Sequence, residues 1–252
     1  MSLLSEPDVI AFRREHYDLL ARLLASEPEP TLLEALRENI ADRAVSAAQV
    51  HRLMGDGWRR MAEHLASDSP EDLVDEFTHI FLGPYSDVLN PYESYYFTRT
   101  LYGQPLADVR GFLAHQSLER AEGRREEPED ALAFELAVMA QLAARQQGGG
   151  DVDPRSLIEP QREFLERHLL IWGPACAANI ESHASARFYK GVGKLLKGFF
   201  EVERDFFHED GGLQIETLEE AIRRYRSPAF RGPIYDPEQL MNRKPSDDPK
   251  DP

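Results

Sequence analysis

Apolar residues recur at helical spacing along almost the whole chain, and this pattern constrains the fold more than any other feature of the sequence. Two of the clearest faces comprise Val50, Leu53, Met54, Trp58, Met61 and Leu65, and Phe188, Val192, Leu195, Leu196, Phe199 and Phe206. No run of β-branched residues alternates with period two, so we expect no sheet. The sequence therefore predicts an all-α fold of roughly nine or ten helices.

Local signals predict where several helices begin. Ser69 supplies a cap, Pro70 suits the first helical position, and Glu71 and Asp72 favour the positive end of a helix. Thr31 with Glu34 has the spacing of a capping box for an earlier helix. Ser46 is a candidate start for a third helix, separate from the helix before it.

The helical pattern extends over residues 1–226, which we interpret as one domain. The stretch 119–130 is highly charged and contains Gly123, so it is a candidate hinge between two helical halves. Pro128 is expected to restart the chain into a helix. Residues 227–252 contain many prolines and charges and few residues to bury, which predicts a disordered tail.

Charge and cysteine content narrow the classes of function. The 45 Asp and Glu residues exceed the 29 Lys and Arg residues, giving a net charge of −16. Such a surface repels nucleic acid and attracts basic partners, such as an arginine-bearing peptide. Cys176 is the only cysteine and cannot form an internal disulfide. No secretion signal or membrane-spanning stretch is evident, so we expect a cytoplasmic protein without stable membrane insertion.

Motifs for catalysis or cofactor binding are incomplete. Glu76 and His79 form one Glu-x-x-His motif, whereas a two-metal helical site needs a second. The run Gly191-Val192-Gly193-Lys194 lacks the other residues of a phosphate-binding loop, so its glycines are better explained by close helix packing. Cys176 lies in a run of small apolar residues and is expected to pack in the core. We therefore predict no catalytic residue, metal or cofactor. A helical metal-dependent hydrolase using His79, or a nucleotide-responsive adaptor, remains the alternative.

An aromatic segment interrupts this acidic, helical chain. The preceding helix is expected to stop at Gly83-Pro84, and the following loop holds Tyr92, Tyr95 and Tyr96. Tyrosines offer a broad apolar surface with polar tips. Such a surface suits recognition of another chain better than bond-making chemistry.

Several motifs in a fixed order resemble the TorD/DmsD/NarJ family of redox-enzyme maturation chaperones. They are Phe81-Leu82-Gly83-Pro84, Pro91-Tyr92-Glu93-Ser94, Tyr102-Gly103-Gln104-Pro105, Glu127-Pro128-Glu129-Asp130, and Glu135-Leu136 with Met139. With Phe77 before them and further matches around 164–172 and 188–189, they cover about residues 77–203. One departure is Ala131, where many members of the family carry His, so a role of that His is not available here.

The resemblance implies a chaperone that is not an enzyme. Its partner would be the catalytic subunit of a molybdenum-containing oxidoreductase of the dimethyl sulfoxide reductase superfamily, together with the twin-arginine leader of that subunit. Such a chaperone would assist molybdenum cofactor insertion before export, as a monomer or a homodimer. We expect the partner-binding residues to be Phe81, Gly83, Pro84, Pro91, Tyr92, Glu93, Ser94, Tyr95, Glu127, Pro128 and Asp130.

Two roles are expected within this set. The aromatic side chains of Phe81, Tyr92 and Tyr95 would line an apolar groove, and the carboxylates of Glu93 and Asp130 would meet the arginines of the leader. Other roles remain open for the same residues. Pro128 and Asp130 also fit a plain helix start, Glu93 also fits a cap of the helix after the loop, and the tyrosines also fit a seal between loop and core.

Overall fold

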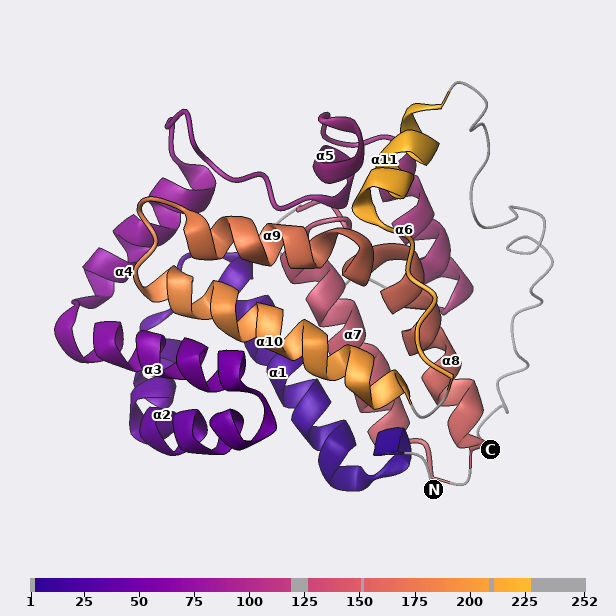
Figure 1. Cartoon of the computed structure of the whole chain (residues 1–252), viewed down its shortest axis with the longest axis horizontal. Helices are drawn as coiled ribbons and strands as arrows, with labels where there is room; N and C mark the ends of the chain where they lie inside the picture. The colour runs from indigo at the N-terminus through magenta and orange to yellow at the C-terminus, as the bar shows by residue number, and fades with distance from the viewer. Residues whose placement is uncertain (1–2, 119–126, 151, 209–210, 228–252) are drawn as a thin grey trace, which may run out of the picture.

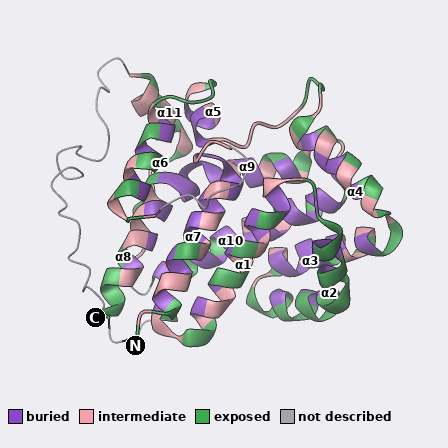
Figure 2. Cartoon of the chain, turned by 180° about the vertical axis from the view of Figure 1, so that it is seen from behind, coloured by how far each residue is buried: buried purple, intermediate pink, exposed green. Residues whose placement is uncertain are grey.

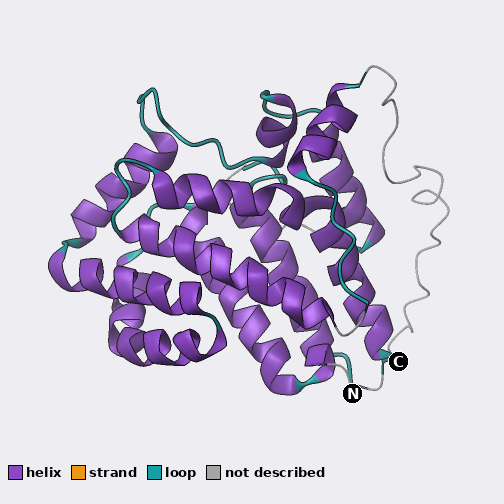
Figure 3. Cartoon of the chain, in the orientation of Figure 1, coloured by secondary structure: helices purple, strands orange, loops and turns teal. Residues whose placement is uncertain are grey.

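The computed structural model describes residues 3–118, 127–150, 152–208 and 211–227, and within these ranges every regular element is helical (Figures 1 and 3). The elements are η1 Leu3–Ser5, α1 Pro7–Ala25, α2 Pro30–Val50, α3 Arg52–Ser67, α4 Pro70–Phe77, η2 Thr78–Leu82, α5 Glu93–Thr98, α6 Gln104–His115, α7 Leu132–Gln147, α8 Pro154–Phe164, η3 Leu165–Leu169, α9 Leu170–Ser182, α10 Phe188–His208 and α11 Leu218–Arg226. The segments η2 and η3 are single π-helical turns that continue α4 and α8. The all-α prediction is confirmed.

Four helix pairs form the framework. Helix α1 packs along α7, α10 lies between α3 and α9, and α2 packs on α3. In Figure 1, α10 and α3 lie towards the viewer and α1 lies behind α10. Figure 2 shows the opposite side, where α1 and α7 run next to each other and buried residues follow their inner faces.

Helix starts follow the predicted signals only in part. The Ser69 hydroxyl accepts the Asp72 N–H at 3.2 Å and the Asp72 carboxylate accepts the Ser69 N–H at 2.9 Å, so this capping box is confirmed. The predicted box at Thr31 is wrong, because α2 begins at Pro30 and makes no side-chain cap. The predicted start at Ser46 is also wrong. Its alanine-rich surroundings favour continuation of α2 to Val50.

Two boundaries differ around the candidate site. Helix α7 begins at Leu132 and not at Pro128, and the aromatic loop contains a short helix, α5. Of the candidate hinge, residues 119–126 lie outside the described residues, as does the predicted tail apart from Ser227. None of the described helices is long and apolar enough to cross a lipid bilayer.

The glycines of α10 let it approach its neighbours closely. A Cβ atom at Gly191 would lie 2.7 Å from the Gly57 carbonyl oxygen on α3, and one at Gly193 would lie 2.9 Å from the Ala177 oxygen on α9. Both distances are too short for any residue with a side chain. The interpretation of this run as a packing motif is therefore confirmed.

Glu76 holds the start of the same helix. Its buried carboxylate accepts the backbone N–H groups of Arg187, Phe188 and Tyr189 at 2.7, 3.2 and 2.8 Å. A carboxylate at a helix N-terminus satisfies donors that have no partner within the helix and favours the helix dipole. The Glu of the Glu-x-x-His motif is thus explained by its structural role at the start of α10.

A buried polar network ties five elements together at the N-terminal end of α1. Arg13 donates to Glu203 at 2.7 and 2.8 Å and to Gln161 at 2.8 Å, and Tyr17 donates to Glu203 at 2.7 Å. Gln161 donates to Gln146, which in turn donates to the Leu4 carbonyl oxygen in η1. The network therefore fixes α1 against α7, α8 and α10.

Candidate peptide-binding site

Two segments far apart in the sequence are joined at the candidate site. The Asp130 carbonyl oxygen accepts the Glu93 N–H at 2.8 Å, and its carboxylate accepts the Ser94 N–H at 3.0 Å. The Leu132 N–H donates to the Pro91 oxygen at 2.9 Å, and Tyr92 forms an antiparallel bridge with Ala131. Asp130 therefore caps α5 from a distant part of the chain instead of starting α7.

The carboxyls of Glu93 and Asp130, which we expected to meet the arginines of a leader, are fully buried. Both Glu93 carboxyl oxygens lie 3.2 Å from Nδ1 of His168, which is also buried. Burial and the nearby Asp130 raise the pKa of Glu93 well above its usual range, and burial lowers the pKa of His168 to about 4. Both shifts favour the uncharged form of the side chain. The arginine-binding role of Glu93 and Asp130 stays a prediction.

Glu135 adds a third buried carboxyl next to these residues. It accepts the Trp172 indole N–H at 3.1 Å and is fully buried. Burial, with the neighbouring Glu93 as a second cause, raises the pKa of Glu135 well above its usual range. Three polar atoms in this region, Ser94 Oγ, Asp130 Oδ1 and His168 Nε2, are buried without a partner within the described part of the chain.

The buried carboxyl of Glu135 predicts how stability changes with pH. Above the ordinary Glu pKa of about 4.3, the unfolded chain releases the proton of this carboxyl while the folded chain keeps it. The free energy of unfolding therefore falls as pH rises, by at most about 1.4 kcal/mol per pH unit. Glu135→Gln removes this titration. The free energy of unfolding of the native chain relative to the variant should therefore fall from pH 5 to pH 8. Urea unfolding at each pH tests this, with exposed Glu34→Gln as the matched control, and a constant difference would contradict it.

The exposed part of the site is aromatic. Tyr92 is half-buried, donates to the Glu127 carboxylate at 3.2 Å, and has a raised pKa through burial and that neighbour. Tyr102 lies close enough to contribute to this shift, and its side chain is 59% exposed. Its backbone has φ of +67°, which is strained for a residue with a side chain. Tyr95 is half-buried beneath Arg99, whose guanidinium lies 5.5 Å from the ring centre.

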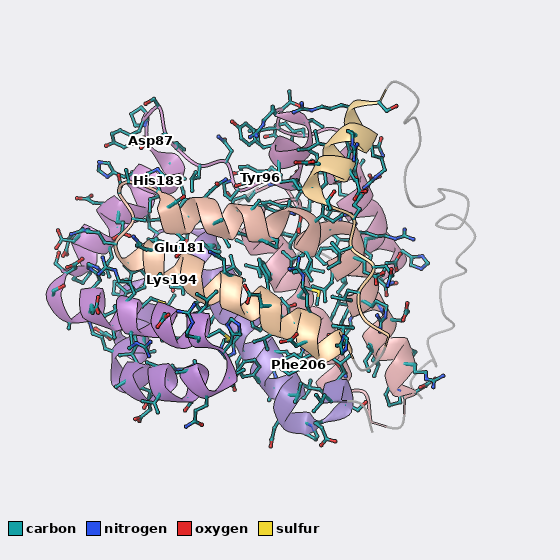
Figure 4. All side chains as sticks on the ribbon, in the orientation of Figure 1. Asp87, Tyr96, Glu181, His183, Lys194 and Phe206 are labelled. Carbon is teal, nitrogen blue, oxygen red and sulfur yellow. The ribbon has the colours of Figure 1, made fainter. Side chains whose placement is uncertain are left out.

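The remaining predicted residues lie elsewhere along the loop. Phe81 packs between Phe77 and Tyr189, with ring centres 4.9 and 5.6 Å apart, and Gly83 donates to the Thr78 oxygen. Pro84 is exposed, while Pro91 and Pro128 are half-buried. The loop is fixed near Asp87, whose carbonyl oxygen lies 3.0 Å from His183 Nε2 (Figure 4). No hydrogen bond or ring contact joins Phe81, Gly83 or Pro84 to Tyr92 within the described residues.

One large concave surface of the described chain was not predicted. It is a groove of about 1060 Å³ between α1 and α7, bordered by residues of α6 and of the α1–α2 connection. Its apolar lining includes Ala21, Leu32, Leu113, Phe134, Ala137 and Val138. The sequence does carry a signal for it, because Ala133, Ala137, Ala140 and Ala144 follow one face of α7 and leave room above the helix.

The groove is electrically asymmetric. Helices α1 and α7 run antiparallel, because Arg14 on α1 donates to Gln147 at the end of α7, at 2.6 Å. The acidic lining residues Glu27, Glu29 and Glu127 therefore fall at the end where α1 finishes and α7 begins. Arg14 and Arg145 fall at the opposite end, where Glu15 and Asp18 balance them, while Arg22 is the one arginine of the lining near the acidic end. Glu127 also receives the hydrogen bond from Tyr92, so the aromatic loop meets the acidic end of the groove.

The fold and this arrangement are those of an all-helical protein with a peptide-sized groove, and comparison with known proteins agrees. The family described as nitrate reductase delta subunit matches residues 47–178, so the chain belongs to this family, which corresponds to the TorD/NarJ group that its motifs resemble. The similar proteins include a chaperone protein TorD of Vibrio cholerae serotype O1, 28% identical over 56% of this chain and 65% of the relative.

Two further relatives extend the comparison. A chaperone protein TorD of a Psychrobacter species is 31% identical over 55% of this chain and 63% of that protein. A perchlorate reductase assembly chaperone protein of Dechloromonas aromatica is 29% identical over 37% of this chain and 42% of that protein. The chain thus spans less than two thirds of each of these three relatives. Their names are those of chaperones and an assembly protein and not of enzymes, in agreement with the prediction of a non-catalytic protein.

Proposed function

We propose that the protein is a cytoplasmic chaperone for a molybdenum-containing oxidoreductase, and that it binds the twin-arginine leader or the apo form of that enzyme. In this role it assists cofactor insertion before export. Family membership supports the chaperone class. The observation that carries leader binding is the groove between α1 and α7, which combines an apolar floor with an excess of carboxylates at one end.

The chemistry of a twin-arginine leader is complementary to this groove. Such a leader has a pair of arginines followed by an apolar stretch, and helix-in-groove recognition places apolar side chains on an apolar floor. The length of α1 along the groove, from Arg14 to Ala25, is ~17 Å at 1.5 Å per residue. The arginine pair would then lie at Glu27, Glu29 and Glu127, where charge-assisted hydrogen bonds are available.

The aromatic loop has a supporting role in this proposal. Tyr92 holds Glu127 at the acidic end through its hydroxyl, and the buried contact between Asp130 and the start of α5 holds Tyr92 in place. Leu101 and Tyr102 are exposed in the segment that follows α5, and in this proposal they extend the apolar surface offered to the leader. Glu93 and Asp130 thus act by organising the loop, and direct contact with arginine would require the loop to open.

The proposal is tested by capture and by peptide binding together. The full chain should co-purify with the catalytic subunit of a molybdoenzyme from its own cell. It should also bind a synthetic twin-arginine leader in isothermal titration. The matched control is the same peptide with both arginines replaced by glutamine, which should bind more weakly and with less sensitivity to salt. Absence of both co-purification and leader binding would refute the proposal.

Tyr102 allows stability and recognition to be separated. Tyr102→Gly removes the strain of the left-handed backbone conformation, which costs about 1–2 kcal/mol for an ordinary residue. This gain offsets the greater loss of backbone entropy that glycine brings on folding. The stability of the variant should therefore stay within about 1 kcal/mol of the native chain, while leader affinity falls because an exposed aromatic contact is lost. Thermal unfolding and peptide titration measure the two effects. Unchanged leader affinity would remove Tyr102 from the binding surface.

The metal-dependent alternative receives no support from the described residues. Glu76 is occupied by three backbone N–H groups, and His79 lies 2.7 Å from the Asp75 oxygen and stacks on Tyr85. No group of three or more His, Cys, Asp or Glu side chains in the described chain is placed to hold a metal ion. The nucleotide-responsive alternative also receives no support from the described residues, because the glycines of 191–194 are buried within α10 and do not form a loop.

A further inference from the structure

We propose that α3 and α10 form a second docking surface, which binds an acidic segment of a partner protein. The surface is a shallow hollow of about 500 Å³, lined by Asp56, Arg59, Arg60 and Glu63 of α3 and by Lys190 and Lys194 of α10. Helices α3 and α10 lie towards the viewer in Figure 1, whereas α1 and α7 are seen from the opposite side in Figure 2. The hollow and the groove between α1 and α7 share no lining residue. It is thus distinct from the site proposed for the leader.

Lysine is unusually concentrated at this surface. The sequence contains five lysines, and two of them, Lys190 and Lys194, line this hollow from adjacent turns of α10. Lys197, one turn further on, pairs with Glu181 of α9 at 2.7 Å and does not line the hollow. Figure 4 shows Lys194 on α10, the helix that packs against α3. In a chain with a net charge of −16, a local group of cations is not explained by overall composition.

The charges in the hollow do not cancel. Arg59 pairs with Asp56, and Arg60 pairs with Glu63 at 3.0 Å. Lys190 and Lys194 make no ion pair or hydrogen bond within the described part of the chain, and Arg60 Nε is buried without an acceptor. Two lysine charges are therefore left for a ligand, and the complementary ligand is an anion.

The position of the cations favours carboxylates of a protein over a phosphate group. Phosphate sites commonly use free backbone N–H groups at a helix N-terminus or a glycine-rich loop. Here the lining residues lie inside α3 and along α10, where backbone N–H groups are used by the helices. Lys190 and Lys194 are one turn apart, a spacing that matches acids one turn apart on a partner helix.

The cations of this surface can attract an anion at short range, although the chain as a whole is acidic. At an ionic strength of about 0.1 M the Debye length is ~10 Å, so distant acids of the chain are screened while cations within the hollow act together. Electrostatic complementarity of this kind selects partners and orients them more than it adds affinity. We therefore expect weak, salt-sensitive binding of an acidic segment.

A labelled polyglutamate peptide tests the proposal by fluorescence anisotropy with the full chain. The peptide should bind at an ionic strength of roughly 0.05 M and be released at roughly 0.5 M. Lys190→Glu with Lys194→Glu should weaken binding about tenfold or more, because two attractions become repulsions. The control pairs Arg155→Glu with Arg223→Glu, two exposed arginines elsewhere that change net charge by the same amount.

Each outcome decides the question. Loss of binding only in the lysine variant, with both variants folded by circular dichroism, supports the surface. No binding to the native chain, or equal loss in both variants, overturns it. Displacement of the peptide by inorganic phosphate at a concentration too low to act through ionic strength would also overturn it, because the hollow would then be a small-anion site. Leader binding should be unaffected by the lysine variant, so failure here is distinct from failure of the leader groove.

Discussion

Glu203→Leu should lower the free energy of unfolding by about 3–5 kcal/mol, the largest effect on stability that we expect from a single substitution in this chain. Glu203 and Arg13 are both fully buried, and the carboxylate accepts two hydrogen bonds from Arg13 and one from Tyr17. The variant leaves the Arg13 guanidinium buried without its counter-charge. A buried charge without its partner costs far more than the pair itself contributes. Urea unfolding followed by circular dichroism measures the loss.

A double variant separates the cost of an unpaired buried charge from the cost of losing the whole ion pair. Arg13→Met with Glu203→Leu removes both charges, so it should be more stable than Glu203→Leu alone. Recovery should be incomplete, because the Tyr17 hydroxyl and Gln161 each lose a hydrogen-bond partner. The coupling energy of the complete mutant cycle reports the interaction directly. A double variant no more stable than the single one would contradict the role given to the buried charge.

Ala137→Trp should weaken leader binding by about 30-fold or more, which corresponds to about 2 kcal/mol. Ala137 is half-buried and lines the groove on α7 within its stripe of small residues. An indole at this position fills the space that the apolar part of the leader would occupy. Isothermal titration with the leader peptide measures the effect.

The matched control is Ala41→Trp, at an exposed position on α2 away from the groove. It adds the same side chain to a helix surface and should leave leader affinity unchanged. Thermal unfolding of both variants shows whether either substitution disturbs the fold. Equal affinity of Ala137→Trp and the native chain would show that the leader binds elsewhere.

The helices were predictable from sequence where local signals act alone. The box formed by Ser69 and Asp72 is complete within four residues, and the structure contains it. Helix α5 was not predicted, because it is short and its cap comes from Asp130, more than thirty residues later in the chain. The start at Ser46 failed because the propensity of the surrounding residues for helix outweighs a single capping residue.

The candidate site shows the same division. The sequence pointed to the segments around Tyr92 and Asp130, and the structure joins them by backbone and side-chain hydrogen bonds. It did not reveal that Glu93 and Asp130 are buried, because burial depends on tertiary packing. The groove was missed for a related reason: a stripe of alanines is compatible with a packed core, and only the arrangement of α1 and α6 around it leaves space.

The polarity of leader binding in the groove is tested most directly by photocrosslinking. Two leader peptides carry the crosslinking residue either beside the arginine pair or at the far end of the apolar stretch. We predict that the first crosslinks to residues near Glu27, Glu29 or Glu127, and that the second crosslinks near Arg14 or Ala144. Crosslinks to α3 and α10, or the two peptides marking the same end or the reversed ends of the groove, would contradict the proposed binding mode.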